Sequence, residues 1–181
     1  MVRLRRLAAA VALAAAVLPT SFPRAQTAAP ADVDPATAQY LSEAAREDRT
    51  AIEASRLVLE RSARTPVREA AKRVLDERTK AQHRLTTAAS VQSLGMRPDK
   101  AAENAGAETV EALRTTAPEG LDRAWLRVAI ESHEAALRLQ QSYGRSGAND
   151  ALRSNAMADA IQLEARIGDL RRLARQLDGP S

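Results

Sequence analysis

The sequence predicts an all-α protein built as a bundle of long helices. Strand-forming residues are scarce, aromatic residues make up 2% of the 181 residues, and Ala, Leu, Arg and Glu dominate. Between Pro66 and Leu94 the apolar residues recur at steps of three and four, which is the period of a helix with one buried face. A chain of this length suits one domain with a real core. We therefore expect a single helical bundle at residues 36–178.

Residues 1–25 have the order of a secretory signal peptide. Three arginines among the first six residues precede the apolar run 7–18, and small or helix-breaking residues follow. The apolar run is too short to remain as a membrane-spanning helix, so we expect cleavage near Ala25, with an uncleaved anchor as the alternative. The sequence thus predicts export to the periplasm, with no integral membrane span after cleavage.

The predicted cleavage also changes the charge balance. The full chain carries 27 basic and 23 acidic residues, but residues 1–25 contain four arginines and no acid, so 23 of each sign remain. A mature chain without net charge, with only Tyr40, Trp125 and Tyr143 as aromatic residues, gives no indication of nucleic-acid binding. The chain has no cysteine, which excludes disulfides and thiol catalysis.

The first helix is expected at residues 36–64. Asp34-Pro35 offers a capping side chain followed by proline at the first helical position. The segment 26–35, rich in Ala, Pro and Thr, is predicted to be a flexible linker. Within the first helix, Asp48 falls inside the apolar stripe and Glu53 lies beside it. The stripe is formed by Leu41, Ala45, Ile52 and Leu59.

The second helix is expected at residues 66–94. Thr65-Pro66 ends the first helix and caps the second, and so short a connection makes the two pack antiparallel. In the middle of the second apolar stripe stands Arg78. The stripe is otherwise formed by Val67, Ala71, Val74, Ala81, Leu85 and Ala88.

The remaining helices follow three breaks in the sequence. Gly95 and Pro98 end the second helix, and Asp99 is expected to cap a shorter, more polar crossover helix that ends near Thr115. Pro118 starts the fourth helix, which carries His133 on its inward face and ends before a turn predicted at 144–148.

The last helix is expected to begin at a cap formed by Asn149. It contains two interleaved seven-residue series, and in one of them the two inner places are Asp159 and Arg166.

The inward polar groups of the four long helices are predicted to form one layer at mid-height. If the crossover makes the second and fourth helices parallel, these groups fall within roughly 6 Å of height, because a helix rises about 1.5 Å per residue. A buried guanidinium is costly unless anionic partners meet it, so we expect an ion-paired network. The alternative places the arginines at the stripe edges with their guanidiniums in water. The candidate members are Arg78, His133, Asp159, Arg166 and Asp48 or Glu53.

A metal site is the competing interpretation of such a layer. Carboxylate-bridged di-iron bundles use two Glu-x-x-His spacings, but Ile130 precedes His133 by three residues and Lys80 precedes His83 by three. Arginine neither ligates a metal nor loses its proton at ordinary pH. We therefore predict no metal and no other cofactor, with Glu53 and His133 as the weak alternative ligands. No phosphate-binding loop or nucleophile elbow is present, and the chain is predicted to be non-enzymatic.

Three segments carry a family resemblance. They are Ile52-Glu53, Lys72-Arg73-Val74-Leu75 through Thr79-Lys80-Ala81 to Leu85, and Asp122-Arg123-Ala124-Trp125-Leu126 through His133-Glu134. Their order and spacing over about residues 39–173 resemble the bacterial exported family known as domain of unknown function 4142. The resemblance implies a ferritin-like four-helix bundle of two antiparallel hairpins with an extra short crossover helix. It also implies a periplasmic location, with association to the outer membrane in some members, and no established activity.

Two positions depart from the family pattern. Members commonly have a histidine directly before Thr-Lys-Ala, where this chain has Arg78, and a last-helix histidine where it has Arg166. Glu53 and His133 keep the residue types of the family. We interpret the two guanidiniums as filling the space and charge of an absent cation.

Three function classes follow from the sequence. The leading one is a periplasmic, non-enzymatic bundle that binds an unidentified protein or small molecule or acts in the envelope stress response. The second is a ferritin-like metal-binding or redox protein. The third is a peripheral membrane or partner-binding bundle whose helices open to expose apolar faces, although the even mixture of charges argues against it.

Overall fold

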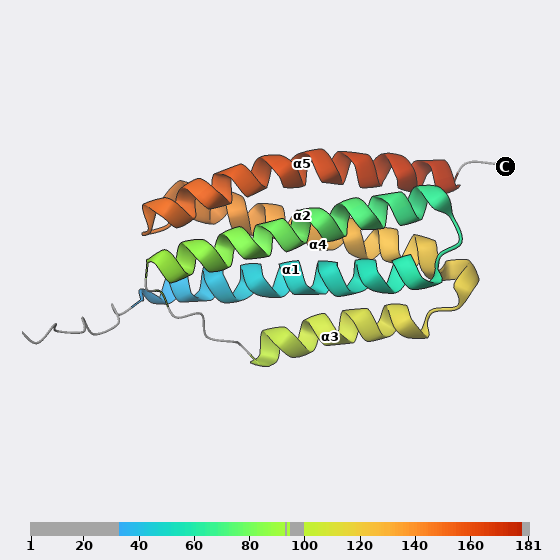
Figure 1. The fold of residues 1–181 in the computed structure, drawn as a ribbon, viewed down its shortest axis with the longest axis horizontal. Coiled ribbons are helices and arrows are strands. Elements are labelled where there is room, and N and C mark those ends of the chain that lie inside the picture. The colour runs from blue at the N-terminus through green and yellow to red at the C-terminus, as the bar shows by residue number, and fades with distance from the viewer. Residues whose placement is uncertain (1–32, 93, 95–99, 179–181) are drawn as a thin grey trace, which may run out of the picture.

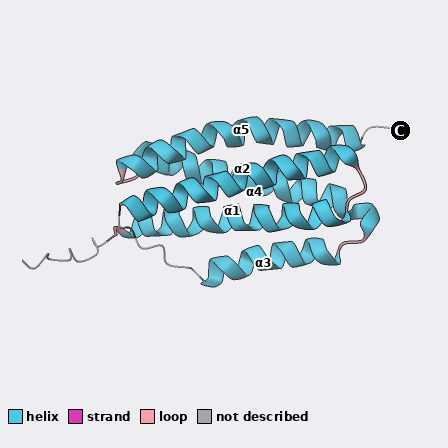
Figure 2. Cartoon of the chain, viewed as in Figure 1, coloured by secondary structure: helices cyan, strands magenta, loops and turns pink. Residues whose placement is uncertain are grey.

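The computed structural model describes residues 33–92, 94 and 100–178 (Figure 1). The predicted signal peptide, most of the predicted linker, the predicted breaks at Gly95 and Pro98 and the predicted cap at Asp99 lie outside these residues. The described chain contains α-helices and no strand, which confirms the all-α prediction (Figure 2). The helices are α1 (Pro35–Arg61), α2 (Thr65–Val91), α3 (Lys100–Thr115), α4 (Pro118–Ser146) and α5 (Asp150–Asp178).

The four long helices lie side by side, and the shorter α3 lies against α1 on the outside (Figure 1). α1 packs antiparallel on α2, and α4 packs antiparallel on α5; α1 also contacts α4, and α2 contacts α5. Because α3 runs back along the length of the molecule, α2 and α4 point in the same direction (Figure 1). Every long helix can therefore contribute a side chain at the same height.

Three of the predicted helix caps fall on described residues, and two of these three are confirmed. The Asp34 carboxylate accepts from the Ala36 and Thr37 N–H groups, both at 3.1 Å, with Pro35 as the first helical residue. The Asn149 side chain accepts from the Leu152 N–H at 3.0 Å. The prediction that Thr65 caps α2 is wrong, because Thr65 is already helical and the N-cap position is taken by an extended Arg64.

The helix ends differ more from the predictions. α1 ends at Arg61 and not at 64, because Ser62 is extended, and α2 ends at Val91 and not at 94. The predicted turn at 144–148 is replaced by helix as far as Ser146. A Cβ on Gly144 would lie 3.0 Å from Cγ of Met157, so this glycine serves the close packing of α4 on α5.

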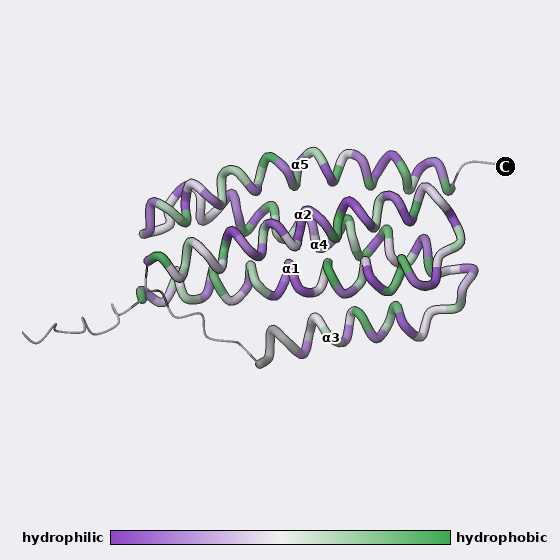
Figure 3. The backbone as a smooth tube through the Cα atoms, viewed as in Figure 1, coloured by the Kyte–Doolittle hydropathy of each residue, from purple (hydrophilic) through white to green (hydrophobic). Residues whose placement is uncertain are grey.

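The core consists of two apolar clusters, one towards each end of the bundle. Each long helix alternates polar and apolar residues along its length (Figure 3). The first cluster lies towards the α1–α2 turn and contains Leu57, Val58, Val67, Val74, Leu121, Trp125, Leu126 and Leu170 among others. The second lies towards the opposite end and contains Tyr40, Leu41, Leu85, Tyr143 and Leu152. The positions between the two clusters hold buried polar residues.

α3 is attached to α1 by a guanidinium and by close packing. Arg61 donates from Nη1 to the carbonyl oxygens of Leu113 (3.2 Å) and Arg114 (2.7 Å), and from Nη2 to that of Thr116 (2.8 Å). These carbonyls lie at the C-terminal end of α3, where the last carbonyl groups of a helix lack helical N–H partners, so a cation there satisfies them and interacts favourably with the helix dipole. The Leu113 carbonyl also accepts from the Thr116 N–H, at 3.2 Å. Near its middle α3 approaches α1 closely at Gly106, where an added Cβ would overlap the Thr50 hydroxyl.

Gly106→Ala is expected to destabilise the fold by about 1–2 kcal/mol, because the new methyl group forces α3 away from α1 or rotates the Thr50 side chain. Urea unfolding of the variant measures this loss. The double variant Gly106→Ala, Thr50→Ala should recover most of it, since the overlapping oxygen is removed. If the double variant is as unstable as the sum of the single variants, the close approach of α3 is contradicted.

Candidate functional site

A buried guanidinium lies at mid-height between the two apolar clusters. Arg78 of α2 is 2% exposed, and it meets Asp159 of α5 in a two-pronged ion pair: Nη2 lies 2.9 Å from Oδ1 and Nη1 lies 3.1 Å from Oδ2. Nη1 also donates to Oδ1 of Asp48 on α1, at 3.2 Å. Two parallel bonds to one carboxylate fix both groups in orientation, so this pair sets how α2 and α5 meet.

The fourth long helix contributes His133, which is 2% exposed. Tyr40 of α1 donates to Gln140 of α4 at 2.8 Å, and the two helices run antiparallel. Continuing that register by about two turns places His133 level with Asp48. Asp48, Arg78, His133 and Asp159 are thus contributed one by each long helix, and we call these four residues the buried polar layer.

Burial controls the protonation of the layer. Loss of hydration raises the pKa of Asp48 to about 7, with Arg78 opposing the rise and the Asp159 charge adding to it. Loss of hydration and the charge of Arg78 lower the pKa of His133 to about 3, so the imidazole is neutral near pH 7. Burial lowers the pKa of Arg78, but the Asp159 and Asp48 carboxylates outweigh it and hold the pKa above its ordinary value.

Two buried polar atoms of the layer have no hydrogen-bond partner among the described residues. They are Nε of Arg78 and Nε2 of His133. Arg84, which follows Arg78 on α2 by six residues or about 1.7 turns, reaches Asp159 from the rim of the layer at 3.4 Å, with its side chain 36% exposed. Within the described part of the chain, Asp159 therefore faces two guanidiniums, whereas Asp48 contacts one.

Two residues that the sequence placed in this layer lie elsewhere. Glu53 is exposed and lines a cavity of about 250 Å³ between α1 and α3, so its assignment to the buried layer is wrong. The side chain of Arg166 is 12% exposed. It lies on the flank between α5 and α2, where it bonds to Glu77, with Nε 2.9 Å from Oε2, and to Asp169 at 2.6 Å.

The residues of the layer do not fit a metal ion. Within the described part of the chain, no group of three or more His, Asp or Glu side chains is arranged to hold a metal. The carboxylates of Asp48 and Asp159 are occupied by the guanidinium of Arg78, whose positive charge repels a metal cation. Glu53 and His133, the weak alternative ligands, are separated by burial: one is exposed beside α3 and the other is inside the bundle.

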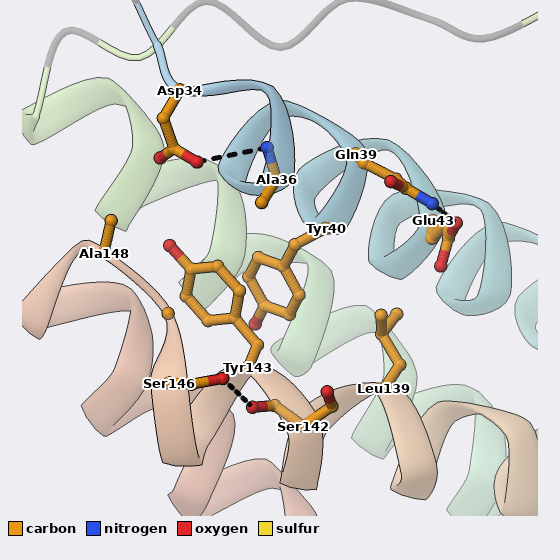
Figure 4. A pocket seen from close by; sticks show the side chains of 11 residues that line it. Asp34, Ala36, Gln39, Tyr40, Glu43, Leu139, Ser142, Tyr143, Ser146 and Ala148 are labelled. Atoms are coloured by element: carbon orange, nitrogen blue, oxygen red, sulfur yellow. Dashed lines mark hydrogen bonds between the residues drawn. The ribbon is translucent and has the colours of Figure 1, made fainter.

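A second feature is a cavity of about 380 Å³ between the start of α1 and the end of α4 (Figure 4). Beside it the rings of Tyr40 and Tyr143 stack with centroids 3.8 Å apart, and the Tyr143 and Thr37 hydroxyls bond at 2.9 Å. Of the residues that the structure describes, the rim carries the carboxylates of Asp34 and Glu43 and no basic side chain, which favours neutral or cationic groups over anions. The remaining lining is Ala36, Gln39, Leu139, Ser142, Ser146, Gly147 and Ala148.

Sequence reasoning did not foresee the tyrosine stack or the role of Arg84. The two tyrosines are about a hundred residues apart, and their contact depends on how α1 meets α4. The only available signal was that both fall on inward positions of their helices.

None of the helices in the described part of the chain has the length and apolar character of a membrane span.

Comparisons with known proteins identify the fold and the family. A crystal structure of a DUF305 fragment from Deinococcus radiodurans superposes with a TM-score of 0.70 and 16% sequence identity, covering 78% of this chain and 97% of that one. At this identity the similarity shows the fold alone. A comparison with curated protein sequences gives no significant match. The sequence matches the family described as domain of unknown function DUF4142 over residues 22–173, and the chain therefore belongs to the DUF4142 family.

Proposed function

We propose that this protein is an exported, non-enzymatic binding protein with the architecture of a ferritin-like four-helix bundle. The signal-like residues 1–25 support export to the periplasm, and the arrangement of α1, α2, α4 and α5 supports the bundle. A role in the envelope stress response would suit a protein at that location. In this proposal α3 is an additional crossover helix.

The ion pair between Arg78 and Asp159 is the observation that carries the proposal. This pair lies in the bundle interior, which is where other helical bundles hold their metal sites. The cation in that place is the guanidinium of Arg78, which does not have the chemistry of a metal ion. The four ionisable residues of the buried polar layer are 2–4% exposed, so a substrate has no access to them. A sealed, ion-paired interior stabilises and orients helices, which leaves recognition to the surface.

The cavity beside Tyr40 and Tyr143 is the recognition surface that we favour. It lies at the end of the bundle where α1 begins, and its rim offers carboxylates and serine hydroxyls (Figure 4). Such a rim suits a neutral or cationic small molecule or a basic protein segment.

A ferritin-like metal or redox protein is the second candidate. One observation favours it: Nε2 of His133 is buried and lacks a partner, and a neutral imidazole nitrogen is a common metal ligand. The crowding of the layer by Arg78 argues against it.

Expression of the full-length chain in a bacterial host tests the proposal. We expect the protein in the periplasmic fraction, shortened by about 25 residues in intact mass, and with metal far below one ion per chain after dialysis. An uncut chain retained in the cytoplasm would contradict export. About one tightly held ion per chain, lost in His133→Ala but kept in the surface control His83→Ala, would establish the second candidate instead.

A further inference from the structure

The charges of the buried polar layer are unequal in number. Asp48 and Asp159 are 4% and 3% exposed, and among the described residues the one guanidinium buried to the same degree is that of Arg78. With both carboxylates ionised, the layer carries one negative charge more than its buried positive charge. An unbalanced charge inside a protein is costly, so either a proton or a further cation must compensate it.

The geometry distinguishes the two carboxylates. Asp159 accepts two bonds from Arg78 and a third contact from Arg84, so both of its oxygens face cations. Asp48 accepts a single 3.2 Å bond, from an Nη1 group that it shares with Asp159. Asp48 is therefore the carboxylate that gains least by remaining ionised.

We propose that Asp48 is a proton-binding site inside the bundle, and that release of its proton is coupled to the Arg84 guanidinium at the rim. When Asp48 is protonated, Arg78 and Asp159 balance each other and Arg84 is not needed. When Asp48 is ionised, the extra negative charge of the layer attracts Arg84 towards Asp159.

The groups that face Asp48 from the neighbouring helices support this assignment. α2 contributes Arg78 and Arg84, and α5 contributes Asp159, whose charge opposes ionisation of Asp48. α4 contributes His133, which is neutral and supplies no compensating charge. Burial outweighs the two arginines, and the pKa of Asp48 rises to about 7.

Other charged groups near the layer are paired away from Asp48. Arg166 on α5 bonds to Glu77 on α2 and to Asp169, on the flank of the bundle. On α1 itself, burial raises the pKa of Tyr40, so its hydroxyl stays protonated and donates to Gln140. α3 packs on another side of α1, next to Thr50. The proton on Asp48 is thus governed by Arg78, Arg84 and Asp159.

The test is an NMR titration of the Asp48 carboxyl carbon in the whole purified chain, from about pH 4 to about pH 9. We expect a midpoint near neutrality, and an increase of roughly half a pH unit or more in Arg84→Gln, because a compensating cation is lost. The matched control is Arg123→Gln, which removes an exposed arginine paired with Asp178 and should leave the midpoint unchanged. A midpoint near 4 for Asp48, or no change in Arg84→Gln, would overturn the proposal.

A stability measurement tests the proton-binding site independently of the titration. Asp48→Asn keeps the shape of the side chain and cannot titrate. The ratio of the folding equilibrium constants, variant over wild type, should therefore rise roughly 100-fold or more between about pH 4 and about pH 7. A ratio that does not change with pH would contradict the proton-binding site.

Discussion

Replacing Arg78 by Met is expected to reduce the free energy of unfolding by about 3–5 kcal/mol at pH 7. The substitution keeps much of the side-chain volume but leaves the Asp159 and Asp48 carboxylates buried without their shared cation. Part of the loss should disappear at lower pH, where Asp48 binds a proton and the uncompensated negative charge is smaller. Urea unfolding at several pH values measures both effects.

Two further variants show whether the loss comes from the buried charges. Arg123→Met removes an exposed arginine whose pair with Asp178 is about two-thirds exposed, and should cost less than about 1 kcal/mol. Replacing Arg78, Asp48 and Asp159 together by apolar residues should recover much of the stability, because no unpaired charge remains. An Arg78→Met variant as stable as Arg123→Met would show that the guanidinium is not held as described.

His133→Leu is expected to change how stability depends on pH. The folded pKa of His133 is about 3, against 6.5 for an ordinary histidine, so the unfolded chain binds a proton first as the pH falls. The wild type therefore loses stability through this group between pH 6.5 and about 3, by up to roughly 5 kcal/mol. His133→Leu removes that loss, and should be more stable than the wild type at about pH 4.

Asp48 contributes with the opposite sign. Its folded pKa is about 7, against 3.8 for an ordinary aspartate, so stability through this group falls as the pH rises between those values. In the wild type the two effects largely cancel, whereas His133→Leu leaves the Asp48 effect alone. Chemical unfolding from about pH 4 to about pH 8 should show a nearly flat wild type and a variant that weakens as the pH rises. His83→Gln, at an exposed histidine, is the control; a His133→Leu profile with the wild-type shape would contradict the account.

The helices and most of the layer could be predicted because both depend on local periodicity. Asp48, Arg78, His133 and Asp159 occupy inward positions of four regular stripes, and the short connections fix the direction of each helix pair. The prediction that Glu53 belongs to the layer is wrong because Glu53 follows Asp48 by five residues. Five residues turn a helix by about 140° beyond a full turn, which directs Glu53 away from the layer.

The contacts of side chains at the edges of the helix stripes could be assigned only from the tertiary structure. Arg166 follows Asp159 by seven residues, and a straight helix drifts about 20° over that interval, which moves the long side chain towards Glu77. Arg84 reaches the layer from an intermediate position, which a stripe pattern assigns to neither face. The stack of Tyr40 and Tyr143 depends on the register of α1 against α4, and the sequence carries no local signal for it.

A double-mutant cycle between Arg78 and Asp159 measures most directly whether a cation has been accepted into the bundle with its counter-charges. The cycle compares the free energies of unfolding of the wild type, Arg78→Met, Asp159→Asn and the double variant at pH 7. We expect a coupling energy of about 2–3 kcal/mol, because either single substitution removes the two-pronged pair and leaves the buried partner with one remaining counter-charge, Asp48 for Arg78 or Arg84 for Asp159. A coupling energy below about 0.5 kcal/mol, as for independent or solvent-exposed groups, would contradict the ion-paired interior.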